Sequence, residues 1–545
     1  MSKYVLGLDF GTKSVRSLLV DIDTGEEIYS SVYEYKNGVI DRYLPESNIK
    51  LPIDTALQDP KDYEDGLEHT IKQILNNTKV NKKDIIGLGI DSTSCTMLPI
   101  KVDSTPLCYI DKYRNDPNSW VKLWKHHSAQ KYATKINNLA TKRGEKFLSK
   151  YGGKISSEWL FPKIMQIAYE SPDIYKDTDI MIESGDWIVY KLTGNLTRNT
   201  SSLGYKSMWD NSFPNISFFK ELDPKLEDIY SKLSGNIKKL GNLAGYLNDN
   251  YQKKLNLPKI PIAAANIDAH VAVPACTVTE PKKMVIIIGT SACHMVLSKK
   301  FREVKGVGGI VKDGIIAGYF GYEAGQASVG DIFEWFIQNS IPYTYFIKAK
   351  KENISIYDYL TKLARKLKPG QSGLIALDWF NGNRSILMDS DLSGLILGLD
   401  LSTKPEEIYR ALLEATAFGT RRIIESFEET GIKIDELYIC GGLVEKNKIL
   451  SQIYSDITRR EIKTANSTYT SALGSAMHAA VASGYYSSIK EAAKNMAHLK
   501  EDKYNPLEEN TSIYNKLYDH YIKLYNYFGL SKNSTMRVLK KLKRN

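Results

Sequence analysis

The chain has 545 residues, which is more than one hydrophobic core usually holds, so two domains with additional segments are expected. Its 42% hydrophobic and 25% charged residues are typical of a globular protein and exclude a disordered chain. The net charge of +10 is spread over lysines interspersed with acidic residues, and such diffuse basicity favours anionic substrates such as nucleotides. Only the run 536–544 is strongly basic, and it indicates either an anionic partner or a solvated terminal helix.

The five cysteines, Cys95, Cys108, Cys276, Cys293 and Cys440, lack metal-binding spacing and lie mostly in apolar stretches, so we expect reduced thiols. The N-terminus enters a predicted strand within a few residues, without the apolar stretch and cleavage site of a signal peptide. No apolar run approaches the roughly 18 residues of a membrane span. The sequence therefore predicts a cytoplasmic protein without a membrane partner.

The first half predicts alternating strands and helices. Strands are expected at 4–10, 14–21 and 26–35, and a helix at 60–76. A buried strand at 85–91 ends in the polar residues of 91–94, and polar side chains at the carboxyl end of a strand lie where α/β folds bind ligands. A helical insertion is expected over 118–168.

The second half repeats this plan. A strand, a turn and a second strand begin at 284, and a helix at 405–429 follows a helical insertion. A strand is expected at 436–440, and Gly441 and Gly442 follow it directly. A helix of small residues, which can pack tightly, is expected at 471–483. We therefore expect an N-terminal domain over 1–279, a C-terminal domain over 280–485 and a helical C-terminal extension over 486–545. The extension carries an amphipathic stripe of tyrosines and leucines that either covers the domain or forms a homodimer interface.

Two Gly-Thr turns occupy corresponding places in the two halves. The first joins two apolar runs at Gly11 and Thr12, and the second does so at Gly289 and Thr290. Glycine lets the backbone approach a ligand closely, so main-chain amides and hydroxyls can surround an anion. One such turn is typical of an ordinary hairpin, but its repetition indicates a duplicated phosphate-binding device.

The chain does not follow the known P-loop pattern, because Thr12 stands where the second glycine of a Walker A motif belongs. The motifs of protein kinases are also absent as an ordered series. Phosphoryl transfer needs a carboxylate that holds a metal, charge neutralisation around the γ-phosphate and a base aimed at the acceptor hydroxyl. The chain offers candidate residues for each of these groups, including Asp9 and the two Gly-Thr turns.

These residues resemble the motifs of the FGGY family of carbohydrate kinases. The first phosphate motif resembles 9–12, the second resembles 289–291, and the adenosine motif resembles 440–447. Asp268 matches the catalytic aspartate of the family, and the resemblance extends from residue 4 to about residue 485. It implies an α/β fold of two actin-like (ribonuclease H-like) ATPase domains around a central cleft, with helical insertions.

The resemblance also implies a set of site residues. Asp268 is the expected catalytic base and Asp9 the expected ligand of Mg²⁺, while ATP is expected to contact Gly11, Thr12, Lys13, Gly289, Thr290, Ser291, Gly441, Gly442 and Asn447. The implied sugar site consists of Ser92, Ser94, Trp124, Lys206, Asp268 and Glu323. Taken alone, such a Trp is more often part of a core and such a Lys or Glu more often lies on the surface. His126 and His127 are expected to form a structural surface pair.

Within the family, the stretches 123–127, 204–209, 321–326 and 377–382 most resemble the branch that phosphorylates L-ribulose. This implies transfer of phosphate from ATP to the C5 hydroxyl of L-ribulose, in L-arabinose catabolism, with small-molecule partners and no nucleic acid. Two alternatives stay open: a kinase of the same family that acts on D-ribulose, ribitol or D-xylulose, and an actin-like ATPase that drives partner binding. The chain departs from the family pattern at Asn266 and Ile267, before the aspartate, and at Cys440.

Overall fold

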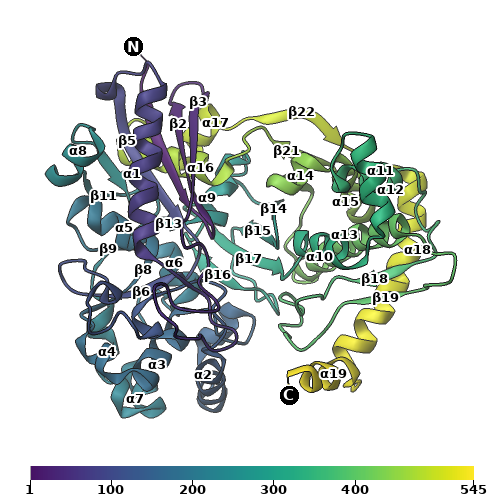
Figure 1. Ribbon diagram of the computed structural model, residues 1–545, viewed down its shortest axis with the longest axis horizontal. Coiled ribbons are helices and arrows are strands. Elements are labelled where there is room, and N and C mark those ends of the chain that lie inside the picture. The colour runs from purple at the N-terminus through teal and green to yellow at the C-terminus, as the bar shows by residue number, and fades with distance from the viewer. Residues whose placement is uncertain (1, 545) are drawn as a thin grey trace. The chain divides into compact units, whose positions relative to one another are not determined.

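The computed structural model describes residues 2–544 and groups them into two compact units (Figure 1). The first unit contains the residues up to Thr279 together with Gly309–Gly321 and Tyr469–His498. The second contains Glu280–Gly308, Tyr322–Thr468 and the residues from Leu499 onward. Two segments from the second half of the chain therefore belong to the first unit.

The first unit is built on a mixed sheet whose strand order is β11-β12-β5-β1-β2-β3, with β13 also paired to β5. β1 is antiparallel to β2 and parallel to β5, and β2 is antiparallel to β3, so a three-stranded meander is joined to parallel strands. These strands are β1 (Tyr4–Phe10), β2 (Ser14–Asp21), β3 (Glu27–Glu34), β5 (Ile85–Ser92), β11 (Leu243–Tyr246), β12 (Pro261–Ala263) and β13 (Asn266–Ile267).

Helices and short strands surround this sheet. The α-helices are α1 (Pro60–Asn77), α2 (Gln130–Arg143), α3 (Leu160–Glu170), α4 (Pro172–Asp177), α5 (Ser184–Thr193), α6 (Thr200–Lys206), α7 (Ile216–Leu222), α8 (Asp249–Leu255), α9 (Asp268–Ala275), α16 (Thr470–Ala482) and α17 (Ile489–Met496). The remaining elements are β4 (Leu57–Gln58), β6 (Met97–Ile100), β7 (Val121–Lys122), β8 (Ile180–Glu183), β9 (Thr197–Asn199), β10 (Asn236–Lys238), β16 (Gly309–Lys312), η1 (Lys82–Asp84), η2 (Leu107–Tyr109), η3 (Pro117–Ser119), η4 (Lys146–Tyr151), η5 (Pro224–Leu226) and η6 (Ile229–Leu233).

The second unit repeats the plan. Its strands belong to a sheet of the order β16-β17-β15-β14-β20-β21-β22, in which β14 is antiparallel to β15 and parallel to β20, as β1 is to β2 and β5. The strands are β14 (Lys283–Ile288), β15 (Ala292–Ser298), β17 (Phe320–Gln326), β20 (Glu436–Cys440), β21 (Ile462–Ala465) and β22 (Leu499–Tyr504). The expected duplication is thus confirmed in the strand topology.

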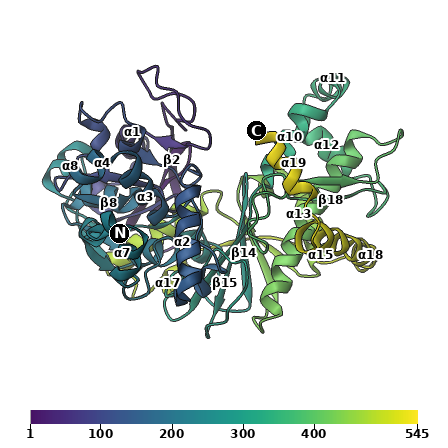
Figure 2. The same ribbon diagram turned by 90° about the horizontal axis from the view of Figure 1, so that it is seen from below.

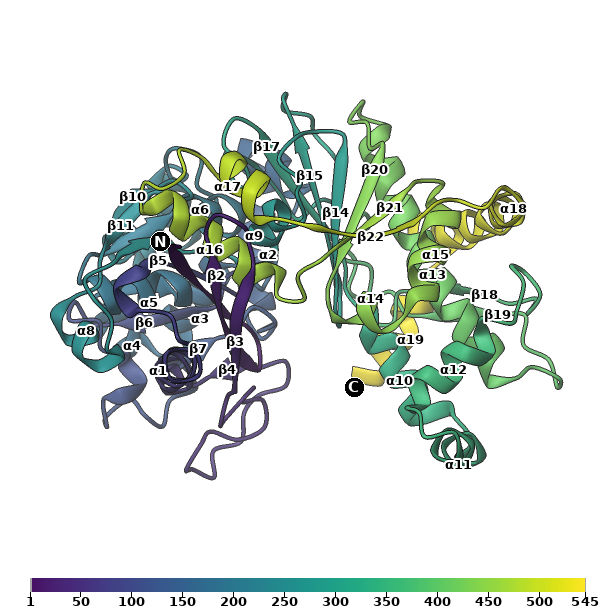
Figure 3. The same cartoon turned by 90° about the horizontal axis from the view of Figure 1, so that it is seen from above.

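The other elements of the second unit are mostly helical. They are α10 (Gly330–Ser340), α11 (Tyr343–Lys351), α12 (Ile356–Ala364), β18 (Ile375–Leu377), β19 (Leu395–Leu397), α13 (Pro405–Glu428), α14 (Gly442–Lys446), α15 (Lys448–Thr458), α18 (Glu508–Tyr525), η7 (Asn526–Leu530) and α19 (Thr535–Arg544). α18 lies beside α15 in Figures 2 and 3, and its tyrosines Tyr514, Tyr518, Tyr521 and Tyr525 are buried. The stripe predicted from the sequence therefore covers its own unit.

Several expected elements differ in detail from the structure. The predicted insertion at 118–168 contains α2 and α3, but a short strand and two 3₁₀ turns interrupt it. None of the five cysteines forms a disulfide, as expected; four of them are buried, while Cys293 is partly exposed. None of the helices between residues 2 and 544 is both long enough and apolar enough to cross a membrane.

α16 packs directly on the backbone of the central strands of the first unit. A Cβ atom at Gly7 of β1 would lie 1.8 Å from the carbonyl oxygen of Ala472, and one at Gly89 of β5 would lie 1.9 Å from that of Ser475. A Cβ at Gly474 of α16 itself would lie 1.9 Å from the carbonyl oxygen of Val271 in α9. Only glycine permits these approaches, because the neighbouring atoms belong to the backbone and cannot move aside.

We therefore expect Gly89→Ala to lower the free energy of unfolding by about 3 kcal/mol, because the added methyl group must push α16 away from the sheet. Urea unfolding followed by circular dichroism measures the loss. Gly442→Ala is the matched control, since a Cβ there would have no heavy atom within 4 Å. Equal unfolding midpoints for the two variants would contradict the expected close packing.

Candidate active site

Three carboxylates lie at the carboxyl ends of neighbouring strands in the first unit. Asp9 of β1 is paired in register with Asp91 of β5, and Asn266 of β13 is also paired with Asp91. β13 ends at Ile267, so Asp268 follows at once as the first residue of α9. The pairing of the strands thus brings together two predicted site residues and Asp91, which was recognised in the sequence only as part of a polar cluster.

The carboxyl group of Asp91 is fully buried, and burial raises its pKa well above the ordinary value. The negative charges of Asp9 and Asp268 raise this pKa further, while a 2.6 Å hydrogen bond from the hydroxyl of Ser475 lowers it. Oδ1 of Asp91 accepts no hydrogen bond from another described residue, and the Asp9 carboxyl is its neighbour. A shared proton or a cation would relieve the repulsion between such a pair.

The first Gly-Thr turn is anchored by several side chains. The amide of Gly11 donates to the carbonyl oxygen of Ser14 at 2.9 Å, which closes the hairpin. Indole Nε1 of Trp124 donates to the hydroxyl of Thr12 at 3.0 Å, so a predicted sugar residue touches a predicted phosphate residue. Arg16 pairs with the carboxylate of Asp9 at 3.1 Å, and Lys13 is exposed at the tip. Arg16 was not singled out from the sequence.

The second Gly-Thr turn is exposed at Gly289 and Thr290, while Ser291 is partly buried. Gly289 donates its amide to the carbonyl oxygen of Ser291 at 2.9 Å. The carbonyl oxygens of Gly289 and Thr290 accept the amides of Gly330 and Asp331 at 3.1 and 3.2 Å, which joins the turn to the start of α10. A Cβ at Gly289 would meet no heavy atom within 4 Å, so space is open above this backbone.

The predicted adenosine motif follows β20. Gly441 has a φ of 108°, and a Cβ there would lie 2.3 Å from the carbonyl oxygen of Ile288, so the position requires glycine. Gly442 opens α14 with no heavy atom within 4 Å of a Cβ position. Asn447 is buried; its side chain accepts the amide of Leu450 at 3.4 Å and donates to the hydroxyl of Tyr409 at 3.4 Å. Asn447 therefore caps α15 and fixes this loop.

The other predicted sugar residues of the first unit surround the loop after β5. Ser92 is buried, and the buried hydroxyl of Ser94 has no hydrogen-bond partner among the described residues. Lys206 is also buried, and its ammonium lies 5.7 Å from the ring centroid of Trp159. A polar group left unpaired in a buried position is costly, so the hydroxyl of Ser94 is suited to a ligand.

Buried charges hold this loop in place. Lys163 donates to the carbonyl oxygens of Cys95 and Leu123 at 2.7 and 2.9 Å, and Glu183 accepts the amide of Cys95 at 3.1 Å. Burial raises the pKa of Glu183 to about 7 and lowers that of Lys163 below its ordinary value. Sequence analysis did not identify either residue, because a lone Lys or Glu in a helix or strand carries no signal of burial.

Glu323, the remaining predicted sugar residue, belongs to β17 in the second unit. Its side chain is 7% exposed, and Oε1 lies 3.7 Å from a guanidinium nitrogen of Arg384. Arg384 was not singled out from the sequence, because it follows Glu323 by 61 positions and no local pattern indicates that the two are close.

One expectation for the neighbouring histidines was wrong. His126 is buried rather than on the surface: its Nδ1 accepts the amide of Ala56 at 3.2 Å, and its Nε2 lies 2.8 Å from Gln166. Burial, together with the charges of Lys122 and Lys163, lowers the pKa of His126 well below its ordinary value. His127 is exposed, as expected.

The described residues include no group of three or more His, Cys, Asp or Glu side chains arranged to hold a metal ion by themselves. Mg²⁺ usually takes only one or two carboxylates and completes its shell with water and substrate phosphates. Asp9 and the unpaired oxygen of Asp91 are hard oxygen donors of this kind. The residues present therefore fit a magnesium ion that is shared with a phosphate ligand.

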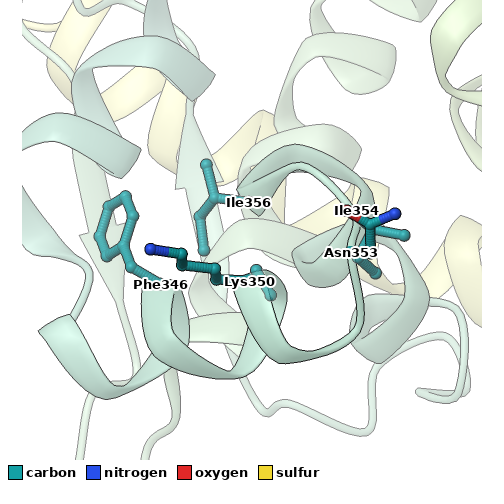
Figure 4. Close-up of a pocket in the computed structure, with 6 residues that line it drawn as sticks. Phe346, Lys350, Asn353, Ile354 and Ile356 are labelled. Carbon is teal, nitrogen blue, oxygen red and sulfur yellow. The ribbon is translucent and has the colours of Figure 1, made fainter.

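A separate hollow of about 340 Å³ lies at α11 and α12 of the second unit, and it is lined by Phe346, Ala349, Lys350, Asn353, Ile354 and Ile356 (Figure 4). It contains none of the residues predicted to bind substrate. We therefore place the candidate site at the strand ends and Gly-Thr turns rather than in this hollow.

Comparison with known proteins identifies the family of this chain. Residues 4–274 match the N-terminal domain of the FGGY family of carbohydrate kinases, and residues 284–483 match its C-terminal domain. "Ribulokinase" from Anoxybacillus flavithermus is 53% identical over 99% of this chain and 97% of its own length, and "Ribulokinase" from Geobacillus thermodenitrificans is 52% identical over the same shares. The crystal structure of gluconate kinase from Lactobacillus acidophilus has the same fold, with a TM-score of 0.77, 18% identity, and coverage of 97% of this chain and 99% of that one. The chain belongs to the FGGY family of carbohydrate kinases.

Proposed function

We propose that the protein transfers the γ-phosphate of ATP to the C5 hydroxyl of L-ribulose, as a step of L-arabinose catabolism in the cytoplasm. The relatives named "Ribulokinase", at 53% and 52% identity over nearly the whole chain, support the sugar. The observation that carries the chemistry is the meeting of Asp9, Asp91 and Asp268 at adjoining strand ends, because phosphoryl transfer needs a metal-holding carboxylate close to a base.

In the proposed reaction, Asp268 accepts the proton of the C5 hydroxyl while that oxygen attacks the γ-phosphorus. The bond from the γ-phosphorus to the bridging oxygen breaks, and ADP leaves with the electron pair. Asp268 suits this role because it is partly exposed at the start of α9, whereas Asp91 is fully buried, which raises the pKa of its carboxyl group. General-base help of this kind is usually worth about 10² to 10⁴ in rate.

The phosphates of ATP would be held by the two Gly-Thr turns. The hydroxyls of Thr12, Thr290 and Ser291 and the exposed Lys13 offer donors to an anion, while Gly289 leaves open space above its backbone and Gly11 forms the first turn. Mg²⁺ bound to Asp9 would offset the negative charge of the phosphates. Gly441 and Gly442 would leave room for the adenosine, and Asn447 would fix the loop on which they lie.

Three of the predicted sugar residues offer polar groups suited to hydroxyls. Ser94 offers an unpaired hydroxyl, Lys206 a buried ammonium and Glu323 a nearly buried carboxylate. A site built to hydrogen-bond a hydroxyl discriminates strongly against a sugar that lacks it or points it elsewhere. The indole of Trp124 links this set to the phosphate turn through Thr12.

The first test is ADP release measured with a panel of sugars. We expect L-ribulose to stimulate ATP turnover far more than D-ribulose, ribitol or D-xylulose, because a site built to hydrogen-bond hydroxyls rejects a sugar whose hydroxyls point elsewhere. Preference for another pentulose or pentitol would assign the protein to a different sugar within the family. ATP turnover that no sugar changes would instead favour an actin-like ATPase that acts on a partner.

The second test replaces the proposed base. Asp268→Asn should lower kcat for L-ribulose by at least about 10²-fold and leave the affinity for MgATP unchanged, because only proton transfer is lost. Asp249→Asn is the matched control, since Asp249 also begins a short helix of the first unit. Near-normal turnover of Asp268→Asn would remove this residue from the mechanism.

The third test concerns the second turn. Gly289→Ala adds a methyl group where no heavy atom lies within 4 Å, so the melting temperature should not change. The methyl group would occupy space that a phosphate needs, so KM for MgATP should rise about tenfold, while KM for L-ribulose at saturating MgATP stays constant. An unchanged KM for MgATP would show that phosphate does not approach this backbone.

A further inference from the structure

The loop formed by residues 383–392 carries Arg384 to the carboxylate of Glu323. This loop lies between β18 and β19, and a guanidinium nitrogen of Arg384 is 3.7 Å from Oε1 of Glu323. The side chain of Glu323 is 7% exposed and that of Arg384 is 28% exposed, so little water screens the pair. The proposed function gives Glu323 a sugar hydroxyl to bind but does not explain what orients its carboxylate.

The same loop is fixed to β17 beside Glu323. The amide of Gly325 donates to the hydroxyl of Ser385 at 3.1 Å, in a buried hydrogen bond. A Cβ at Gly325 would lie 3.6 Å from Cδ of Arg384, so the aliphatic part of the arginine side chain packs against the strand at this glycine. The loop is thus held against β17 at two points, one through the aliphatic part of Arg384 and one through the adjacent Ser385.

The C-terminal helix α19, drawn in yellow at the end of the chain in Figure 1, holds the other end of the loop. Arg537 contacts Oδ2 of Asp389 through two nitrogens, at 2.9 and 2.8 Å. Lys540 donates to the carbonyl oxygens of Ser390 and Leu392 at 2.6 and 3.2 Å. The basic run at the C-terminus therefore contacts acceptors of the protein's own loop.

A backbone bridge joins the two ends of the loop. Asn383 and Asp389 exchange two main-chain hydrogen bonds of 2.9 Å, and the side chain of Asn383 accepts the amide of Leu387 at 2.9 Å. Asp389, which Arg537 holds, is therefore bonded directly to the residue before Arg384. A continuous set of contacts runs from α19 through Asp389 and Asn383 to Arg384 and Glu323.

We propose that Arg384 is a positioning residue that orients the carboxylate of Glu323 for ketopentose recognition, and that α19 clamps the 383–392 loop so that Arg384 stays in place. A guanidinium suits this task because it is planar and always charged, and it loses little freedom for each contact it makes. The inference rests on the proposed function, because it assumes that Glu323 contacts the sugar. It gives the C-terminal helix a part in substrate selection without a contact to substrate.

The experiment measures steady-state kinetics of the full-length protein after changes along this set of contacts. Arg537→Gln should raise KM for L-ribulose about fivefold and Arg384→Gln about tenfold, while KM for MgATP and the melting temperature stay unchanged. Arg537→Lys should restore much of the affinity because it keeps the charge opposite Asp389. Lys541→Gln, at an exposed position of the same helix, is the matched control and should behave as wild type.

A double-mutant cycle separates this inference from the proposed function. If α19 acts through Glu323, Arg537→Gln should have no further effect on KM for L-ribulose in the Glu323→Gln background. An equal effect in both backgrounds would overturn the inference. So would wild-type KM values for Arg384→Gln and Arg537→Gln together with a raised KM for Glu323→Gln, and this outcome would leave the proposed function intact. An unchanged KM for Glu323→Gln would remove Glu323 from the sugar site and overturn both assignments.

Discussion

The close contact between α16 and the central strands of the first unit determines where the carboxylates of the candidate site lie. Gly7 and Gly89 let the helix backbone approach the sheet until a Cβ would fall within 2 Å of a carbonyl oxygen. At that separation the hydroxyl of Ser475 reaches Asp91, 384 residues earlier in the chain, at 2.6 Å. A bulkier residue on either strand would move the helix and break this bond. The glycines are therefore as important to the site as the acidic residues themselves, because they set the position of the donor that Asp91 needs.

The three neighbouring carboxylates repel one another unless a proton or a cation neutralises part of their negative charge. Asp9, Asp91 and Asp268 sit at the ends of adjoining strands, and the buried member responds with a strongly raised pKa. Asp9 has the guanidinium of Arg16 beside it, but the side chain of Arg16 is 43% exposed, so solvent weakens that pair. A protein can tolerate such repulsion where the ligand brings the missing positive charge. This arrangement suits a site that binds a metal together with phosphate, because the cation would offset the repulsion between the three neighbouring carboxylates.

Much of the fold could be predicted because its signals are local. The strand of 4–10, the Gly-Thr turns and the helices beginning at Pro60 and Pro405 follow from hydrophobic periodicity and turn residues, and the structure confirms them. The contacts of the site depend on partners far away in the chain. Asn447 matched a nucleotide motif but caps α15, and the basic C-terminal run is separated by 148 residues from Asp389, which it holds. His126 looked like a surface residue because nothing nearby in the sequence reveals Gln166, its buried partner.

The two Gly-Thr turns started from one plan but are used differently. Around the first, Trp124 and Gln58 bond the hydroxyl and the carbonyl oxygen of Thr12, so side chains tie this turn to the remainder of its unit. Around the second, the amides at the start of α10 take up the carbonyl oxygens of Gly289 and Thr290, and the glycine surface stays open. Because the amide of Gly289 already donates to the carbonyl oxygen of Ser291, what the second turn offers an anion is its hydroxyls and its free space. The first turn is instead bonded to Trp124, which is proposed to bind sugar, so under the proposed function this turn would couple sugar with phosphate while the second would hold phosphate alone.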